Sequence, residues 1–382
     1  MNKKYSLCQP VRKVRPIKTI YPMRSNRLLL FLLWTLFVLF WLTSSAVFSL
    51  ALAEDISLSD DAYHYQDWKN GRHDGNYTEW WYFNFFDGKQ DFQCIFTYLI
   101  TDPDNITGRG FAQVTAVAYA PGGIVSENDA YAPGMFSASY VSPDVEIGSN
   151  SIWVINDDVY EITGASLDGR LSWDLTYVRK ADPWFAADRM KVGFLPWEQM
   201  DWLVYMPRAE VTGEVTVDGN VYSVSGVPGY HDHNWGEWIP SDALWNWGQY
   251  SEPGLAFELG DFIGKPVGLA SVDFRGERTV FTKDQYSLAH TRWAYDSRNR
   301  VWYPTQTVLS AGNESAVLIL TIRSIRTDPL RGDLPLPLPD VIIYEQTARY
   351  EGQFWKRDAQ GQWVLAAPIQ GNGFKEYTAI HY

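Results

Sequence analysis

The sequence predicts an almost entirely β-stranded, antiparallel protein. Phe, Trp and Tyr make up 16% of the 382 residues, and aromatic side chains favour strands. Short apolar or alternating runs lie between turn signals, and no heptad pattern is sustained along the chain. Strands at such regular spacing are typical of sandwiches and barrels rather than of βαβ units.

Each predicted strand ends at a turn signal. The run EWWYFNFF (79–86) ends at Asp87-Gly88, and DFQCIFTYLI (91–100) ends near Asp102-Pro103. Asp218-Gly219 stands between two alternating runs, which is typical of a hairpin. Further strands are predicted over residues 112–120, 151–157, 158–169, 170–179, 209–226 and 315–326.

Two stretches lack this alternation. Residues 184–207 are the least β-like part of the chain, and we interpret them as a loop with a helical turn over a barrel mouth, its aromatic side chains facing a ligand. Residues 327–340 contain four prolines, which cannot donate backbone hydrogen bonds in the middle of a sheet. We therefore predict an extended surface loop there.

The first 53 residues differ from the rest of the chain. Eight basic residues and no acidic one lie before Leu28, and the 26 residues from there to Ala53 carry no charge. A basic segment, an apolar stretch and the small residues of an A-x-A site predict an export signal. The alternative is an uncleaved membrane anchor over residues 28–53, because this stretch exceeds the ~20 residues that span a bilayer. Both interpretations place the folded part in the periplasm or outside the cell.

The remaining chain is strongly acidic. Removing the eight basic residues of the first segment leaves 24 basic against 45 acidic residues, a net charge of −21. Such a surface repels phosphate backbones, so the charge argues against nucleic acid as a partner. Cys94 is the only cysteine after the export segment, which excludes an intrachain disulfide despite the oxidising location. Stability must therefore come from a packed core.

After segment 1–53 we predict two β-domains, residues 54–240 and 241–382. The boundary lies in WIPSDALW (238–245), where Pro240 and Ser241 interrupt the alternation. About 330 residues remain after the export segment, which is more than a single domain usually holds.

The decapeptide GYHDHNWGEW (229–238) gathers unusual chemistry, because it holds two of the six histidines of the chain. On a regular strand His231, His233 and Trp235 share one face, and Asp232 lies on the other. H-x-H-x3-E resembles half of a cupin metal motif with His231, His233 and Glu237 as ligands, but the second half is missing, so we expect no metal. Alternatively, these side chains are hydrogen-bonded wedges in a core, although burying an acid and two imidazoles together is unfavourable without a purpose.

Four segments together resemble the carotenoid 1,2-hydratase family, also called hydroxyneurosporene synthases, which groups with AttH-type proteins. They are GNYTEWWYFNFF (75–86), VPGYHDHNWGEW (227–238), LWNWGQY (244–250) and GNGFKEYT (371–378). The resemblance spans roughly residues 70–382. It implies two fused lipocalin-like antiparallel β-barrel domains and the addition of water to a terminal C=C bond of an acyclic carotenoid or related isoprenoid, with no cofactor.

Such a reaction needs a buried carboxylic acid that keeps its proton, aromatic faces around the carbocation and a held water. Asp232 supplies the acid if the strand is irregular, and Gly229 and Gly236 are compatible with a bulge there. In the family a His-x-Trp pair and a Tyr/Asp pair on the next strand matter. His233 and Trp235 match the first pair, whereas GLAFELGDF (254–262) offers other residues. The candidate catalytic residues are Asp232, His231, His233, Trp235, Glu258 and Asp261.

The run EWWY supplies a candidate pocket wall, with Glu79 and Trp81 on one face of the strand; the alternative for Trp81 is a core position. The candidate substrate-binding residues are Glu79, Trp81, Tyr230, Trp245 and Trp247. The predicted partner is an apolar isoprenoid or carotenoid ligand. The alternatives to a hydratase are a non-catalytic carrier of a lipid or isoprenoid, in the manner of AttH-type relatives, and a polyene or terpenoid cyclase.

Overall fold

The computed structural model describes residues 56–331 and 340–381. The export or anchor segment predicted at residues 1–53 lies outside the described residues. Within them, no helix is long and apolar enough to cross a membrane. The prediction of an all-β chain with lipocalin-like β-domains is confirmed, since the described chain forms a nearly closed barrel and a half-barrel sheet.

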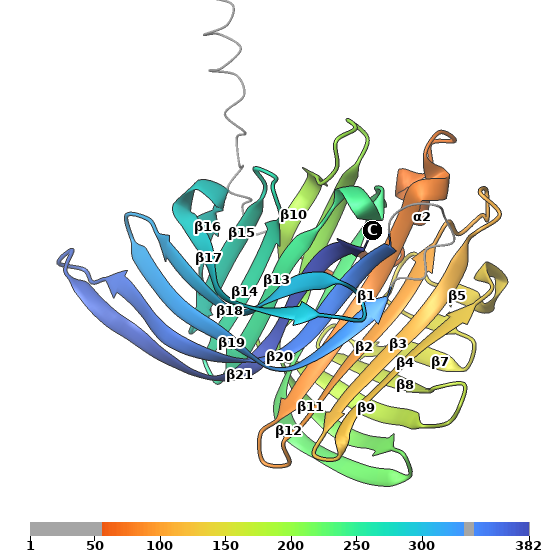
Figure 1. The fold of residues 1–382 in the computed structure, drawn as a ribbon, viewed down its shortest axis with the longest axis horizontal. Coiled ribbons are helices and arrows are strands. Elements are labelled where there is room, and N and C mark those ends of the chain that lie inside the picture. Colours follow the sequence, from red (N-terminus) through yellow and green to blue (C-terminus); the bar gives the residue numbers. More distant parts are fainter. Residues whose placement is uncertain (1–55, 332–339, 382) are drawn as a thin grey trace, which may run out of the picture. The chain divides into compact units, whose positions relative to one another are not determined.

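The first sheet forms the nearly closed barrel, with strand order β4-β3-β2-β1-β12-β11-β9-β8-β7-β6-β5 and β10 paired to β11 (Figure 1). Its strands are β1 (Tyr77–Asp87), β2 (Phe92–Thr101), β3 (Phe111–Ala120), β4 (Gly123–Tyr131), β5 (Phe136–Ala138), β6 (Val145–Ile147), β7 (Asn150–Asn156), β8 (Val159–Ala165), β9 (Leu171–Arg179), β10 (Trp184–Lys191), β11 (Gln199–Val217) and β12 (Asn220–Glu237). Short helical segments accompany it: η1 (Leu58–Asp60), α2 (Tyr65–Trp68), η2 (Asp74–Asn76) and η3 (Pro133–Met135).

The second sheet is the half-barrel, with strand order β16-β15-β14-β13-β21-β20-β19-β18-β17. Its strands are β13 (Trp245–Glu252), β14 (Leu255–Phe262), β15 (Gly268–Phe274), β16 (Glu277–Thr282), β17 (Tyr286–Asp296), β18 (Val301–Gly312), β19 (Ala316–Arg331), β20 (Asp340–Arg357) and β21 (Trp363–His381). The turn η5 (Lys283–Gln285) joins β16 to β17, and η4 (Pro240–Asp242) lies where the chain passes from one sheet to the other. The division into domains 54–240 and 241–382 stays a prediction.

The hairpin predicted at Asp218-Gly219 is confirmed. The two residues connect β11 to β12 and adopt φ angles of 47° and 79°, the left-handed conformation that a tight turn of this kind requires.

The loop predicted over residues 184–207 is wrong, because β10 and the start of β11 occupy most of it. Register shifts between Phe185 and Ala187, and between Ala187 and Met190, break the alternation that would have revealed the strands. The surface loop predicted over residues 327–340 is wrong for its first residues, which belong to β19, since Pro329 pairs with Tyr344. Residues 332–339 of this prediction lie outside the described residues. The pairing of β18 with β19 reaches only Arg323, so Pro329 lies in a part of β19 that pairs with β20 alone among the described strands.

Three large apolar clusters and a small one around Ile342, Tyr344 and Ala379 hold the described part of the fold together. One fills the first barrel, and a second packs along the second sheet. A third draws on both sheets, with Tyr82, Trp202 and Tyr230 from the first and Trp247 and Phe374 from the second. The first sheet is therefore covered by apolar side chains on both faces, and its outer face contacts the second sheet.

Candidate active site

The decapeptide 229–238 divides its side chains between the two faces of β12. β12 pairs with β1 without a register shift from Gly229 to Glu237, so strict alternation holds. The bulge that we expected within the decapeptide is absent. Instead, the neighbouring strand β11 is irregular, because it advances three residues, from Leu203 to Met206, where β12 advances two. Gly236 instead permits close strand approach, because a Cβ there would lie 2.2 Å from the carbonyl oxygen of Gln199.

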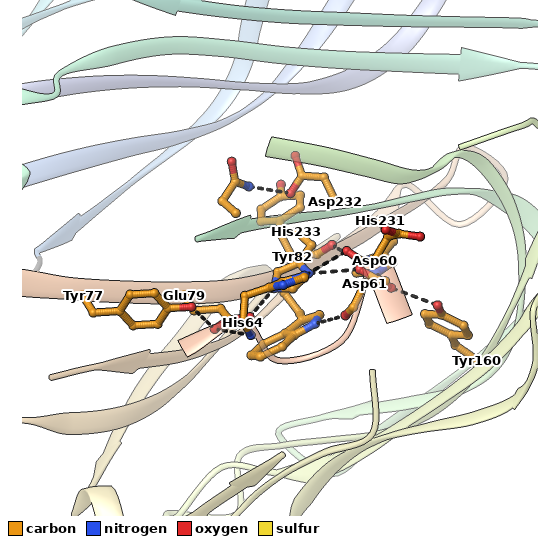
Figure 2. A network of polar contacts seen from close by, with 12 residues as sticks. Asp60, Asp61, His64, Tyr77, Glu79, Tyr82, Tyr160, His231, Asp232 and His233 are labelled. Atoms are coloured by element: carbon orange, nitrogen blue, oxygen red, sulfur yellow. Dashed lines mark hydrogen bonds and ion pairs between the residues drawn. The ribbon is translucent and has the colours of Figure 1, made fainter. Parts of the chain in front are cut away.

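On the inner face of β12, His231 and His233 join a set of hydrogen-bonded polar side chains (Figure 2). We call this set the barrel network, and it consists of Asp61, Tyr77, Glu79, Tyr160, His231 and His233. His231 Nε2 lies 2.9 Å from Asp61 Oδ2, and His233 Nε2 lies 2.8 Å from Glu79 Oε1. Tyr160 donates its hydroxyl to Asp61 at 2.9 Å, and Tyr77 donates to Glu79. Both histidines, Asp61 and Glu79 are fully buried.

The charges of the barrel network compensate one another. Both ring nitrogens of His233 face carboxylates, since Nδ1 lies 3.2 Å from Asp61 Oδ1. Burial alone would lower the pKa of His233, but the carboxylates outweigh it and raise the pKa above its ordinary value. Burial likewise works against ionised Asp61, yet His231 and His233 lower its pKa to about 2. The group is thus a buried, compensated set of ion pairs.

Five of the predicted site residues lie in this barrel interior. They are His231, His233, Trp235, Glu79 and Trp81. Trp81 stacks on His233 with ring centroids 4.4 Å apart and donates its indole N–H to the carbonyl oxygen of Asp61. Trp235 stacks on the ring of His64 at 4.0 Å. These contacts bind the segment around Asp61 to β1 and β12.

A cavity of about 580 Å³, which we call the intersheet cavity, opens on the other face of β12. Residues of β1, β2, β3, β11 and β12 line it from the first sheet, and residues of β13, β14, β20 and β21 line it from the second. Five tryptophans contribute to its wall: Trp80, Trp202, Trp238, Trp245 and Trp247. Its volume falls in the range of small-molecule sites. Aromatic walls with a few acidic groups suit an apolar ligand whose reaction develops positive charge.

Asp232 lies in the wall of the intersheet cavity and is only 3% exposed. Its carboxylate accepts hydrogen bonds from Tyr230 at 2.8 Å, from the Trp202 indole at 2.9 Å and from Asn234 at 3.3 Å. Burial raises the pKa of Asp232, the donors oppose it, and the pKa settles at about 6. Gly260 leaves room for this arrangement, because a Cβ there would lie 2.4 Å from the Trp202 ring.

Two further acids line the cavity, and they face each other. Glu345 of β20 is the direct cross-strand partner of Glu376 of β21. The Trp245 indole donates to Glu376 at 2.7 Å, whereas Glu345 Oε2 has no partner among the described residues. Burial, and for Glu345 the adjacent Glu376, raise both pKa values. Because two buried carboxylates so close cannot both ionise, the pair holds a proton near neutral pH.

The remaining predicted acids differ in position. Asp261 lines the cavity, pairs with Lys283 and accepts hydrogen bonds from Tyr286 at 2.7 Å and Asn246 at 3.2 Å. Glu258 is fully buried within the second sheet, outside the cavity lining, and accepts a hydrogen bond from Ser271. Burial raises the pKa of Glu258 to about 7. Of the predicted binding residues, Trp245 and Trp247 line the cavity. Tyr230 is outside the cavity lining and donates its hydroxyl to Asp232.

Glu258→Gln is expected to stabilise the protein at pH 8 but not at pH 4. The folded-state pKa of Glu258, about 7, exceeds its ordinary value of 4.5, so folding stability is lost as pH rises through this window. The gain should approach about 3 kcal/mol at pH 8. Urea unfolding at both pH values measures it, with exposed Glu161→Gln as the control. Equal effects of Glu258→Gln at both pH values would contradict the explanation.

Sequence reasoning missed Glu345, Glu376, Trp202 and Asp61. Glu376 lies in GNGFKEYT, and Glu345 directly follows the apolar run VIIY. An acidic residue within or next to an apolar strand was the sequence feature that could have identified both glutamates. Glu237, named as a ligand in the metal alternative, accepts a hydrogen bond from Asn70 at 2.9 Å. Among the residues of known placement, no group of three His, Cys, Asp or Glu side chains could hold a metal ion.

Comparison with known proteins finds similarity in structure alone. No family profile matches the sequence, and no curated protein matches it. A solved structure described as AttH from Nitrosomonas europaea superposes with a TM-score of 0.63 at 15% identity, covering 86% of this chain and 98% of that one. Kievitone hydratase from Nectria haematococca gives 0.57 at 16% identity over 87% and 94%, and CghA gives 0.52 at 14% over 81% and 90%. The chain therefore has the lipocalin-like β-fold of these solved proteins.

Proposed function

We propose that the protein adds water to a C=C bond of an apolar isoprenoid, with the end group of an acyclic carotenoid as the favoured substrate. The observation that carries this proposal is the facing pair of buried carboxyl groups, Glu345 and Glu376, in an aromatic cavity that Asp232 also lines. The sequence resemblance to carotenoid hydratases supports the reaction, and one protein of similar fold is itself named a hydratase.

Asp232 and the Glu345–Glu376 pair, which all line the cavity, divide into an acceptor and a donor of protons. Asp232 receives three hydrogen bonds, all of which favour its carboxylate. The Glu345–Glu376 pair receives only the Trp245 indole among the described groups, so it retains its proton more strongly. After burial, the charge of Asp232 is a further cause that raises the pKa of both glutamates. We therefore assign the proton donor to the pair and the base to Asp232, instead of the acid role that the sequence predicted for Asp232.

The reaction then proceeds in two balanced steps. The Glu345–Glu376 pair transfers its proton to the less substituted alkene carbon, and the electron pair of the C=C bond forms the new C–H bond. Positive charge on the other carbon is stabilised by indole faces such as those of Trp80, Trp238 and Trp247. Water attacks this carbon and loses a proton to Asp232, which returns it to the pair. The net change is the addition of one water molecule.

The test is turnover in isotopically labelled water. Purified protein is incubated with an acyclic carotenoid or a shorter terpenoid in H₂¹⁸O, and the products are separated by mass. We expect a tertiary alcohol that carries one ¹⁸O atom. A product isomeric with the substrate would instead indicate a cyclase, and a ligand that binds but returns unchanged would indicate a carrier. Either result would refute the hydratase proposal.

A further inference from the structure

The amide side chain of Asn234 lies beside Asp232 in a mostly aromatic part of the intersheet cavity wall. Both side chains project from the same face of β12, two residues apart, and both line the cavity. Asn234 is the direct cross-strand neighbour of Trp80 on β1 and of Trp202 on β11, whose side chains line the cavity as well. An apolar side chain at this position would suit an apolar ligand better, so the amide must serve a polar contact.

One hydrogen bond fixes the orientation of the Asn234 amide. Its nitrogen donates to Asp232 Oδ1 at 3.3 Å, and a carboxylate oxygen accepts only from the nitrogen end of an amide. The other end, Asn234 Oδ1, receives no hydrogen bond from the described residues, yet it is not enclosed by protein atoms. Because Asn234 keeps 5% exposure and lines the cavity, this oxygen is the end of the side chain that is open to the cavity.

Asp232 can accept one more hydrogen bond next to this amide oxygen. Its Oδ2 accepts from both Tyr230 and the Trp202 indole, whereas its Oδ1 accepts from Asn234 alone among the described groups. A carboxylate oxygen offers two lone pairs, so Asp232 Oδ1 retains one. The nitrogen and oxygen of an amide share one carbon atom, so a single water molecule can bridge Asn234 Oδ1 and Asp232 Oδ1. Two acceptors placed in this way match the two hydrogens of one water molecule.

We infer that Asn234 and Asp232 together hold the attacking water, and that Asn234 thereby decides whether the carbocation is hydrated. The inference rests on the proposed function, because it assigns a role within that reaction. With both hydrogens held by the two acceptors, the water oxygen keeps its lone pairs free for the cationic carbon. The C–O bond forms from one lone pair, one O–H bond breaks, and its proton passes to Asp232.

A carbocation without the held water has a different fate. It loses a proton from a neighbouring carbon to Asp232, and the electron pair of that C–H bond restores an alkene. Asn234 thus sets the partition between alcohol and alkene without taking part in the first proton transfer from the Glu345–Glu376 pair. A residue that only oriented Asp232 would slow both outcomes together, because Asp232 is the base in each.

Turnover in D₂¹⁸O measures both fates in one experiment. Protonation delivers deuterium in either case, capture by water adds ¹⁸O, and loss of a proton from the cation gives an alkene that carries deuterium without ¹⁸O. Lycopene and farnesene are the probes, and the products are separated by mass. Asn234→Leu keeps the size of the side chain but removes both polar atoms. It should lower the ratio of ¹⁸O-alcohol to deuterated alkene at least about tenfold, while total deuterium incorporation falls less than about threefold.

Asn128→Leu is the matched control for this substitution. Asn128 lines the cavity from β4, which β3, β2 and β1 separate from β12 in the sheet. The control should leave the product ratio unchanged. A wild-type product ratio in Asn234→Leu, or in Asn234→Val if the leucine variant fails to fold, would overturn the inference.

The same experiment separates the role of Asn234 from the proposed function. If the wild type forms no ¹⁸O-alcohol from either probe, the hydratase proposal fails and the role of Asn234 fails with it. If the wild type forms the alcohol and the Asn234 variants lower alcohol and deuterated alkene in equal proportion, hydration stands and Asn234 only orients Asp232.

Discussion

Glu345→Gln is expected to lower kcat by at least about three orders of magnitude while changing ligand affinity less than about threefold. General acid catalysis usually contributes 10²–10⁴-fold, and the substitution removes one carboxyl of the pair to which the proton donor is assigned. The uncharged acid contributes little to the binding of an apolar chain, so affinity should persist. Steady-state kinetics and titration with the same substrate separate the two effects.

Asp232→Asn should cause a comparable loss of kcat by removing the base, again with binding nearly intact. The pH profile of wild-type kcat/KM should fall on the acid side as Asp232, with a pKa of about 6, takes up a proton. It should fall on the alkaline side as the glutamate pair loses its proton, and this limb should be altered in Glu345→Gln.

Glu258→Gln is the comparison for these variants, because Glu258 lies outside the cavity lining but was a candidate donor on sequence grounds. We expect it to retain turnover. Loss of turnover in Glu258→Gln with full activity in Glu345→Gln would show that the proton donor is Glu258 and that the assignment to the Glu345–Glu376 pair is wrong.

Asp61→Ala should destabilise the protein by about 3–5 kcal/mol at pH 7, because it removes the buried carboxylate that His231 and His233 share and leaves only His233 with a carboxylate partner, Glu79. The folded-state pKa of Asp61, about 2, lies below its ordinary value of 3.8. Its contribution is therefore complete above pH ~4 and is lost as pH falls toward 2. Denaturant unfolding of wild type and variant should thus differ much more at pH 7 than at pH 2.5.

Asp60→Ala is the control for Asp61→Ala, since the side chain of the neighbouring Asp60 hydrogen-bonds to nearby Ser57 at a partly exposed site. A loss below about 1 kcal/mol in Asp61→Ala would show that the barrel network is held by packing, with its ion pairs contributing little. Tyr160→Phe, which removes a single hydrogen bond to Asp61, should cost about 1 kcal/mol.

Local patterns in the sequence were sufficient to predict much of the fold. The hairpin at Asp218-Gly219 follows from two residues that tolerate left-handed backbone, and the division of Asp232 from His231 and His233 follows from strand alternation. The stretch 184–207 was misread because β-bulges in the β10–β11 pair shift side chains from one face to the other. Alternation is informative only where the ladder is regular.

The site was harder to predict, because its groups meet through register between distant segments. Glu345 and Glu376 lie 31 positions apart in the sequence, and only the pairing of β20 with β21 places them opposite each other. Asp61 lies outside the strands and reaches His231 across 170 positions. No local sequence pattern specifies these contacts between distant segments. The sequence therefore identified Asp232 as a candidate but not the glutamate pair that lines the same cavity.

The alternation of β12 has a practical consequence for protein engineering. Positions 231, 233 and 235 are committed to the barrel interior, whereas Asp232 and Asn234 face the cavity. A combinatorial library at Asn234 and at cavity positions on β13 can alter ligand choice without touching Asp232 or the ion pairs that hold the barrel. Randomising the odd positions would mostly yield chains that no longer fold. One strand thus separates the side chains that face the ligand from those that hold the barrel together, and it does so at every second residue.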